Sequence, residues 1–253
     1  MKKVLSILLV CLFLTGCTPA RPTETATAPI STVTEPTPTA QPTEPTQAPT
    51  AAPTELPTTS PEPADDILVR VADHVPGIRQ NLLYATADNF TGQQIYDFAD
   101  AYLRYGTVKK LKAVSEELAQ RGLGILIWDG FRPLAAQEKL WEICPDPAYV
   151  SHPVTGSRSH CRGSAVDLTL VDPKTGTNLE MPTDFDDFTT LADRDYSDCS
   201  EEAAKNARLL EEVMKKHGFK PYSAEWWHFS DTDDYPVDET FRPEQTVFEG
   251  GIG

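Results

Sequence analysis

Residues 159–167 of this chain read Ser-His-Cys-Arg-Gly-Ser-Ala-Val-Asp, and residues 225–228 read Glu-Trp-Trp-His. The first stretch is a Ser/Gly-rich turn that leads into an alternating strand, and it carries one imidazole and one carboxylate. The second stretch adds another imidazole and a spare carboxylate. Three protein ligands, an open fourth position for water and a general base nearby are the parts of a catalytic zinc site. Together the two stretches predict one zinc ion per chain.

Few residues compete for the role of ligand, because the chain has only five histidines. His217 follows two lysines at a predicted helix C-terminus, which is a helix-dipole position. His74 and His152 have no carboxylate or histidine at ligand spacing. Cys161 adjoins a candidate ligand and is either a further ligand or a packed neutral thiol. By elimination, His160 and His228 are the better pair of histidine ligands, and Asp167, on the strand after His160, is the carboxylate ligand.

Each motif has a plainer interpretation when it is taken alone. A histidine near an aspartate is often a structural hydrogen bond, and Trp226 and Trp227 either wall a site or pack in the core. Glu225 and His228 lie three positions apart, so a regular strand would turn them to opposite faces. The segment must therefore twist, bulge or turn if Glu225 is to take a proton from zinc-bound water and pass it to the leaving amine.

A third motif, Asp-Gly-Phe-Arg-Pro at residues 129–133, follows a short apolar run. Arg132 comes where a loop leaves the edge of a sheet. A guanidinium there could stabilise an oxyanion or hold a carboxylate. The alternative is a surface salt bridge with Asp129 or Glu138.

The apolar pattern predicts one α+β domain at residues 66–253, with a central antiparallel sheet flanked by helices. Apolar residues at helical spacing mark helices, and an unbroken apolar run marks a buried strand. Alternation of apolar and polar residues over 166–170 marks a half-buried strand, and this register turns Asp167 away from the apolar face and towards a polar cleft. The predicted helices span residues 93–105, 108–120, 133–143 and 200–217, and the predicted strands span residues 123–128 and 166–170.

The N-terminal part of the chain carries signals for export rather than for a fold. Residues 1–16 combine two lysines with an apolar stretch too short to span a membrane, which predicts a signal peptide. Leu-Thr-Gly-Cys, ending at Cys17, resembles the lipobox of bacterial lipoproteins; the alternative is an ordinary secretory signal. Residues 17–65 comprise this lipidation site and a disordered Thr/Pro-rich tether. We expect an exported lipoprotein anchored to the outer face of the bacterial cell membrane.

The charge of the chain argues against one class of partner. The 22 basic and 38 acidic residues give a formal net charge of −16. Nucleic-acid binding needs a basic face, so we expect no nucleic-acid partner. The sequence does not indicate an oligomeric state.

Residues 84–92, 129–133, 160–170 and 225–228 resemble zinc D-alanyl-D-alanine dipeptidases of the vancomycin-resistance type. These enzymes belong to the D,D-peptidases that share a fold with hedgehog signalling domains, and the resemblance covers nearly all of residues 75–243. It implies zinc-dependent hydrolysis of D-Ala-D-Ala to two D-alanines. The implied site has zinc ligands His160, Asp167 and His228, catalytic base Glu225, and transition-state residue Arg132.

The residues that bind substrate in this family are matched less completely in this chain than the zinc ligands are. Asp186 falls where the family has an acidic residue thought to receive the free amino group of the dipeptide. Arg158 stands where the family has a serine, so the neighbouring Ser159 is our candidate for a second substrate-binding residue.

The export signal is a further departure, because the well-known dipeptidases of this type are cytoplasmic. We expect this chain to act outside the membrane, on D-Ala-D-Ala or on wall peptides that end in it. One alternative is a D,D-carboxypeptidase that trims terminal D-Ala from peptidoglycan peptides. An alternative of another class is a non-catalytic, zinc-containing binding protein of the cell surface.

Overall fold

The structure is a computed structural model that describes residues 61–246. The predicted signal peptide, the lipidation site at Cys17 and the tether up to residue 60 lie outside this range. Asp65 already contacts the domain, because its backbone oxygen accepts a hydrogen bond from the N–H of Gly106 at 3.0 Å. Between residues 61 and 246, no helix is both long enough and apolar enough to cross a membrane.

A five-stranded sheet forms the centre of the domain, with strand order β2-β4-β5-β7-β6. The strands are β1 (Leu68–Arg70), β2 (Arg79–Gln80), β3 (Tyr102–Arg104), β4 (Gly124–Asp129), β5 (Ala165–Val171), β6 (Phe219–Tyr222) and β7 (Glu225–Asp231). The helices are α1 (Tyr105–Gln120), α2 (Leu134–Ile143) and α3 (Glu201–Lys216). All neighbouring strands of the central sheet pair antiparallel except β2 and β4, and β1 and β3 form a separate antiparallel pair. The predicted α+β class and central antiparallel sheet are confirmed, with one parallel strand added at the edge.

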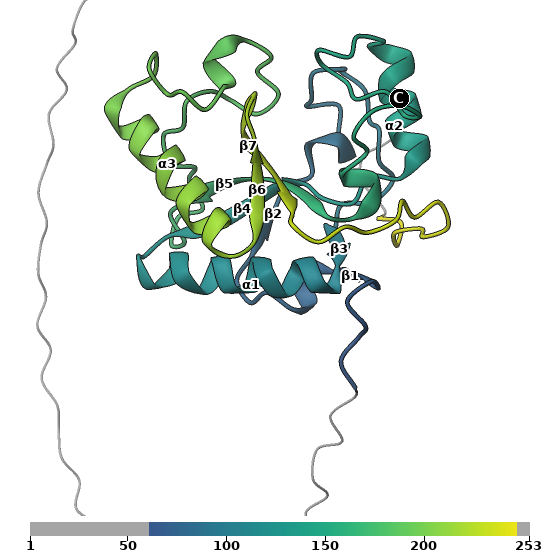
Figure 1. Cartoon of the computed structure of the whole chain (residues 1–253), viewed down its shortest axis with the longest axis horizontal. Coiled ribbons are helices and arrows are strands. Elements are labelled where there is room, and N and C mark those ends of the chain that lie inside the picture. Colours follow the sequence, from purple (N-terminus) through teal and green to yellow (C-terminus); the bar gives the residue numbers. More distant parts are fainter. Residues whose placement is uncertain (1–60, 247–253) are drawn as a thin grey trace, which may run out of the picture. The chain divides into compact units, whose positions relative to one another are not determined.

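Helices α1 and α3 pack against each other and against the sheet, while α2 lies across the strands from α3 (Figure 1). Helix α3 shows why the local sequence forms a helix. The hydroxyl of Ser200 accepts a hydrogen bond from the N–H of Ala203 at 3.0 Å and so caps the N-terminus. Acidic residues fill the first turn and lysines fill the last, as the helix dipole favours. Gly218 follows at a φ of 87° and ends the helix.

The helix predicted over residues 93–105 is wrong. The chain is irregular from residue 93 to residue 101 and then enters β3, and helix α1 begins only at Tyr105. The rings of Tyr96 and Phe98 are both buried, and they stack with their centroids 4.6 Å apart. Positions two apart lie on opposite sides of a helix but on the same side of an extended chain, so this stacking requires the extended path.

Strand β5 is also more buried than its alternating pattern predicts. All seven residues from Ala165 to Val171 are buried, so the prediction of a half-buried strand is wrong. The strand lies in the middle of the sheet between β4 and β7. The apolar side chains of β5 face the core, and Asp167 faces the site described below. The alternation of apolar and polar residues therefore marks two buried faces of the strand, one apolar and one polar.

Gly163→Ala is expected to lower the free energy of unfolding by about 2–4 kcal/mol. Gly163 has a φ of 68°, which an L side chain rarely adopts, and an added Cβ would overlap Cδ2 of Leu68. Gly122→Ala is the matched control, because Gly122 has a φ of 74° but open space around the added carbon. Urea denaturation of both variants separates the backbone strain from the clash. Equal destabilisation by the two substitutions would show that the clash at Gly163 relaxes without cost.

Candidate metal centre

The three predicted ligands meet in one place. Asp167 on β5 is the register partner of His228 on β7, so their side chains lie on the same face of two adjacent strands. His160 comes from the 3-10 turn His160–Arg162 that precedes β5. Oδ1 of Asp167 lies 2.9 Å from Nδ1 of His228, and Oδ2 lies 3.3 Å from Nε2 of His160. One ligand atom from each residue lies within 4.8 Å of the other two.

The orientation of the two imidazoles fits a metal ion. Nδ1 of His160 lies 2.8 Å from the carbonyl oxygen of Gly130, which can only accept, so Nδ1 carries the proton and Nε2 keeps its lone pair. The hydroxyl of Ser230 lies 3.2 Å from Nε2 of His228, so a proton on that nitrogen leaves Nδ1 free. Nε2 of His160 then faces Nδ1 of His228 at 3.2 Å. Two lone pairs and a carboxylate at such distances repel one another unless a cation lies between them, and this donor set suits zinc.

The carboxylate ligand is held in its charged form. Burial by itself would raise the pKa of Asp167, but the imidazoles of His160 and His228 outweigh it. The pKa of Asp167 therefore lies well below its ordinary value. An ionised carboxylate is the form that binds a metal ion.

Glu225 reaches the same cavity as the ligands, although it lies three residues before His228. It is the first residue of β7, directly after the two-residue turn from β6, and the pairing register of the two strands shifts at this point. The irregular start of β7 brings Oε2 of Glu225 to 3.9 Å from Nδ1 of His228. Burial raises the pKa of Glu225 above its ordinary value, which suits a carboxylate that must accept and return a proton.

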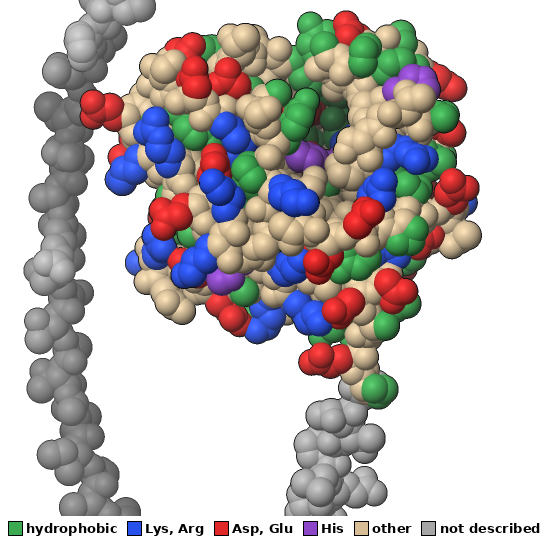
Figure 2. All heavy atoms as spheres, in the orientation of Figure 1, with side chains coloured by type: hydrophobic (Ala, Val, Ile, Leu, Met, Phe, Trp, Pro, Cys, Tyr) green, Lys and Arg blue, Asp and Glu red, His purple; other side chains and the backbone are tan. Residues whose placement is uncertain are grey.

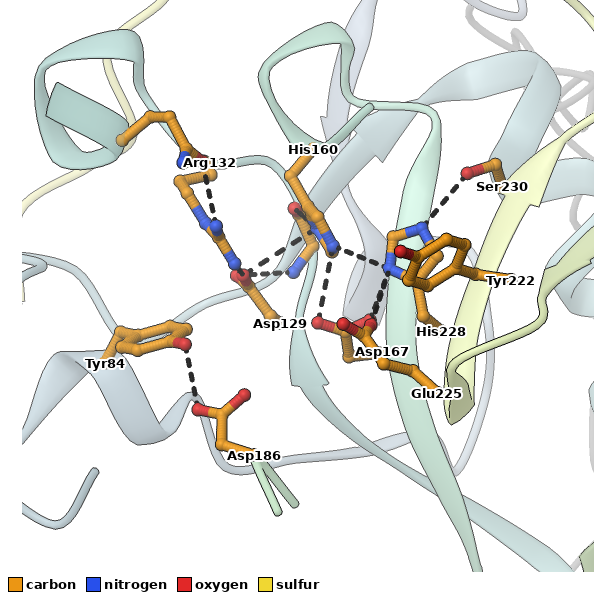
Figure 3. A network of polar contacts seen from close by, with 12 residues as sticks. Tyr84, Asp129, Arg132, His160, Asp167, Asp186, Tyr222, Glu225, His228 and Ser230 are labelled. Atoms are coloured by element: carbon orange, nitrogen blue, oxygen red, sulfur yellow. Dashed lines mark hydrogen bonds and ion pairs between the residues drawn. The ribbon is translucent and has the colours of Figure 1, made fainter. Parts of the chain in front are cut away.

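Arg132 is held beside the ligands by a buried network (Figure 3). Its Nη2 donates to Oδ2 of Asp129 at 2.6 Å, and its Nη1 donates to Oε1 of Gln137 at 2.8 Å. The hydroxyl of Tyr96 donates to Oδ1 of Asp129 at 2.8 Å. Each terminal nitrogen of Arg132 keeps one further N–H, and Arg132 lines the cavity. The predicted salt bridge with Asp129 exists, but it is buried rather than exposed, and Glu138 takes no part in it.

Gly130 connects this network to the metal ligands. Its N–H donates to Oδ1 of Asp129 at 2.8 Å, and its carbonyl oxygen accepts from Nδ1 of His160. The backbone N–H of Arg132 donates to the carbonyl oxygen of His160 at 3.2 Å. The loop after β4 therefore fixes the positions of Arg132 and His160 together.

Asp186 closes one end of the cavity. Its Oδ2 accepts a hydrogen bond from the hydroxyl of Tyr84 at 2.8 Å, and its backbone has a φ of 58°. Burial raises the pKa of Asp186 to about 8, and the charge of Asp167 adds to the effect. No basic side chain of residues 61–246 forms an ion pair with Asp186. A buried carboxylate without such a partner favours a cationic ligand, because a positive charge beside it restores the solvation that burial removed.

Comparison with known proteins agrees with this geometry. A family model, Peptidase_M15, described as D-ala-D-ala dipeptidase, matches residues 65–246. The chain belongs to this family. Membership makes it a zinc metallopeptidase, and zinc is the cofactor that the donor set of His160, Asp167 and His228 fits.

Two curated relatives carry the name D-alanyl-D-alanine dipeptidase. The protein of Escherichia coli (strain K12) is 40% identical over 163 residues, which cover 64% of this chain and 83% of that protein. The protein of Enterococcus faecium is 33% identical over 182 residues, which cover 64% of this chain and 90% of that protein. The solved structure of VanYB in complex with D-Alanine-D-Alanine aligns with a TM-score of 0.36 at 14% identity, over 53% of this chain and 73% of that chain.

The cavity of this M15 peptidase encloses about 480 Å³ beside the metal ligands. Figure 2 shows the face hollowed at this place, with hydrophobic and basic side chains around the opening. Ser159, the candidate for a second substrate-binding residue, lines the cavity, and so does Arg158. Trp227 lines the cavity and Trp226 packs in the core, and both are fully buried.

Sequence reasoning missed the roles of several residues of the site. They are Tyr84, Gln137, Tyr222 and Ser230. One signal was available for Ser230, since it lies two residues after His228 and a strand places both on one face. Gln137 gave no such signal, because its contact with Arg132 depends on how α2 packs.

Within residues 61–246, the other histidines lie outside the ligand group, as predicted, and so does Cys161. His217 pairs with Glu117, at 2.7 Å from Oε2. His74 packs against Tyr105 and His152 packs against Trp141. Cys161 is fully buried, and burial raises its pKa to about 11, which favours the packed neutral thiol over a ligand.

Asp186→Asn is expected to stabilise the metal-free domain more at about pH 8 than at about pH 5. Because the pKa of Asp186 rises from 3.8 to about 8 on folding, the folded state keeps a proton that the unfolded state releases. As the pH rises from about 5 to about 8, the wild type loses the stability that this proton gives to the folded state. The amide of the variant does not titrate in this range, so the variant does not lose stability in this way. Urea unfolding at the two pH values should differ by about 3–4 kcal/mol in the effect of the substitution. An effect independent of pH would contradict the expectation.

Proposed function

We propose that this chain hydrolyses D-Ala-D-Ala to two D-alanines with the help of zinc. The observation that carries the proposal is Asp186, at one end of the cavity that holds the zinc ligands: its carboxylate is buried and has no ion-pair partner among the described residues. A dipeptide has its free ammonium group one residue from the scissile bond. Asp186 can pair with that ammonium, whereas the neutral amide of a longer peptide at the same place would leave the carboxylate buried and unpaired.

The residues of the site support a division of labour in this reaction. Zinc, when bound, polarises the scissile carbonyl and lowers the pKa of water. Glu225 takes a proton from the attacking water as the new C–O bond forms, and it gives a proton to the amine as the C–N bond breaks. The spare N–H groups of Arg132 stabilise the carbonyl oxygen as it gains negative charge. Asp186, with Tyr84, holds the ammonium and so positions the scissile bond.

Two alternatives predict different results. A D,D-carboxypeptidase would accept wall peptides that end in D-Ala-D-Ala, in which the amine next to the scissile residue is acylated. A non-catalytic zinc-binding protein would need neither Glu225 nor the held guanidinium of Arg132. The buried network around Arg132 favours the enzyme over the binding protein.

One experiment separates these possibilities. D-Alanine release by the purified protein would be followed from D-Ala-D-Ala and from a pentapeptide that ends in D-Ala-D-Ala, with and without chelator. We expect chelator-sensitive cleavage of the dipeptide alone. Asp186→Ala should reduce dipeptide hydrolysis at least about a hundredfold and keep its zinc. Cleavage of the pentapeptide would instead make the chain a carboxypeptidase, and zinc without cleavage would make it a binding protein.

We also propose that the enzyme acts on the outer face of the bacterial membrane as a lipoprotein. Support comes from residues 1–16 and Cys17 in the sequence. In fractionated cells the activity should follow the membranes, and Cys17→Ala should release it into the soluble exported fraction. Activity that stays in the cytosol for both proteins would contradict export.

A further inference from the structure

The charged side chains around the cavity are not evenly paired. The acidic residues that line it are Asp167, Asp186 and Glu225, and the basic ones are Arg132, Arg158 and Lys220. Arg132 is neutralised by the buried Asp129. Neither Arg158 nor Lys220 has an ion-pair partner in the described part of the chain, residues 61–246. The chain has 38 acidic residues, so carboxylates that could pair with these two cations are plentiful. Two basic side chains left unpaired in one cavity therefore favour an anionic ligand there.

Arg158 combines a left-handed backbone with an unpaired buried donor. Its φ is 52°, in the left-handed region, which costs a residue with a Cβ about 1–2 kcal/mol. Its Nε is buried without a hydrogen-bond partner in residues 61–246. A strained backbone and an unpaired buried donor at a cavity wall are typical of a residue that completes its contacts with a ligand.

Lys220 is placed at the end of the cavity opposite Asp186. It is the register partner of Ser230, so the two side chains lie on the same face of β6 and β7. Ser230 contacts His228 on the side of the metal ligands away from Tyr84 and Asp186, as Figure 3 shows. Lys220 itself is exposed, at the rim of the cavity.

We propose that Arg158, with Lys220 at the rim, forms a subsite for the free carboxylate of the substrate's C-terminal residue. This inference rests on the proposed function and adds the recognition of the other end of the substrate. A dipeptide is a zwitterion, and with its ammonium at Asp186 its carboxylate lies on the far side of the scissile bond. Arg158 binds that carboxylate through its guanidinium, and Lys220 attracts it electrostatically from the rim.

The test compares two substrates that differ only in that charge, D-Ala-D-Ala and D-Ala-D-alaninamide. The wild-type enzyme should cleave the free acid with a kcat/KM about tenfold to a hundredfold higher than that for the amide. Arg158→Gln should remove most of this preference by raising KM for the acid, and it should leave kcat/KM for the amide within about twofold. Lys220→Gln should reduce the preference by about threefold, more at low salt than at high salt.

Arg158 lies two residues from His160, so its substitution must be checked for damage to the metal site. Cleavage of D-Ala-D-alaninamide and the zinc content of the variant are the internal controls for such damage. Lys205→Gln is the matched charge control, since Lys205 is exposed on α3 and its single ion-pair partner in the described residues 61–246 is Glu202. Unchanged preference for the free acid in both Arg158→Gln and Lys220→Gln would overturn the subsite. An equal loss on both substrates in Arg158→Gln would also overturn it, since that residue would then act through the metal site. Failure of the wild-type enzyme to cleave either substrate would instead reject the proposed function.

Discussion

Glu225→Gln is expected to lower kcat for D-Ala-D-Ala about a thousandfold while KM and zinc content stay close to those of the wild type. The amide has nearly the shape of the carboxylate, so it keeps the packing at the start of β7. It cannot accept a proton from the attacking water. Because Glu225 lies 3.9 Å from Nδ1 of His228 and does not belong to the ligand group, the metal should remain bound.

Steady-state release of D-alanine and the zinc content of the same preparation measure this effect. Glu202→Gln on α3 is the matched control, because Glu202 is exposed and, among residues 61–246, its carboxylate pairs only with Lys205. The control should retain full activity. A Glu225→Gln enzyme that keeps more than about a tenth of wild-type kcat would show that another group transfers the proton.

Loss of a ligand should have the second large effect. His228→Ala is expected to reduce bound zinc from about one per chain to less than about a tenth and to abolish measurable hydrolysis. Asp167 and His160 alone leave too few donors for a stable site. The variant should also lose the rise in unfolding temperature that zinc gives the wild type, since only a ligand that binds the folded state stabilises it.

The matched control is His217→Ala, because His217 pairs with Glu117 on the surface and lies outside the ligand group. Zinc content and thermal unfolding, each with and without chelator, give readouts that do not depend on activity. His228→Ala with stoichiometric zinc would show that the metal is held by other residues.

Local sequence features made three helices and the ligand set predictable. Apolar spacing and caps predict the helices over residues 108–120, 133–143 and 200–217, and the structure reproduces them within a few residues. The ligands followed from the scarcity of histidine and from the presence of a carboxylate at the start of a strand. These features depend on residue types at short range, which the sequence states directly.

Contacts between distant segments were out of reach of such reasoning. Tyr96 and Phe98 are close along the chain, but both rings are buried in the core, and this burial with the rings stacked imposes an extended path where the pattern favoured a helix. The shifted register between β6 and β7 decides that Glu225 faces the metal ligands. The depth at which Asp186 is buried, and hence its raised pKa, depends on how the loops close over it.

The sequence by itself therefore determined the kind of chemistry, because the donors of a zinc site and its base are residue types with specific properties. Only the tertiary structure decided which charged side chains share the cavity with the zinc ligands. It puts Asp186 at one end of the cavity and Lys220 near the other, on strands and loops that are distant along the chain. Strand register and loop packing are set by the burial of the whole core, and no local pattern encodes them.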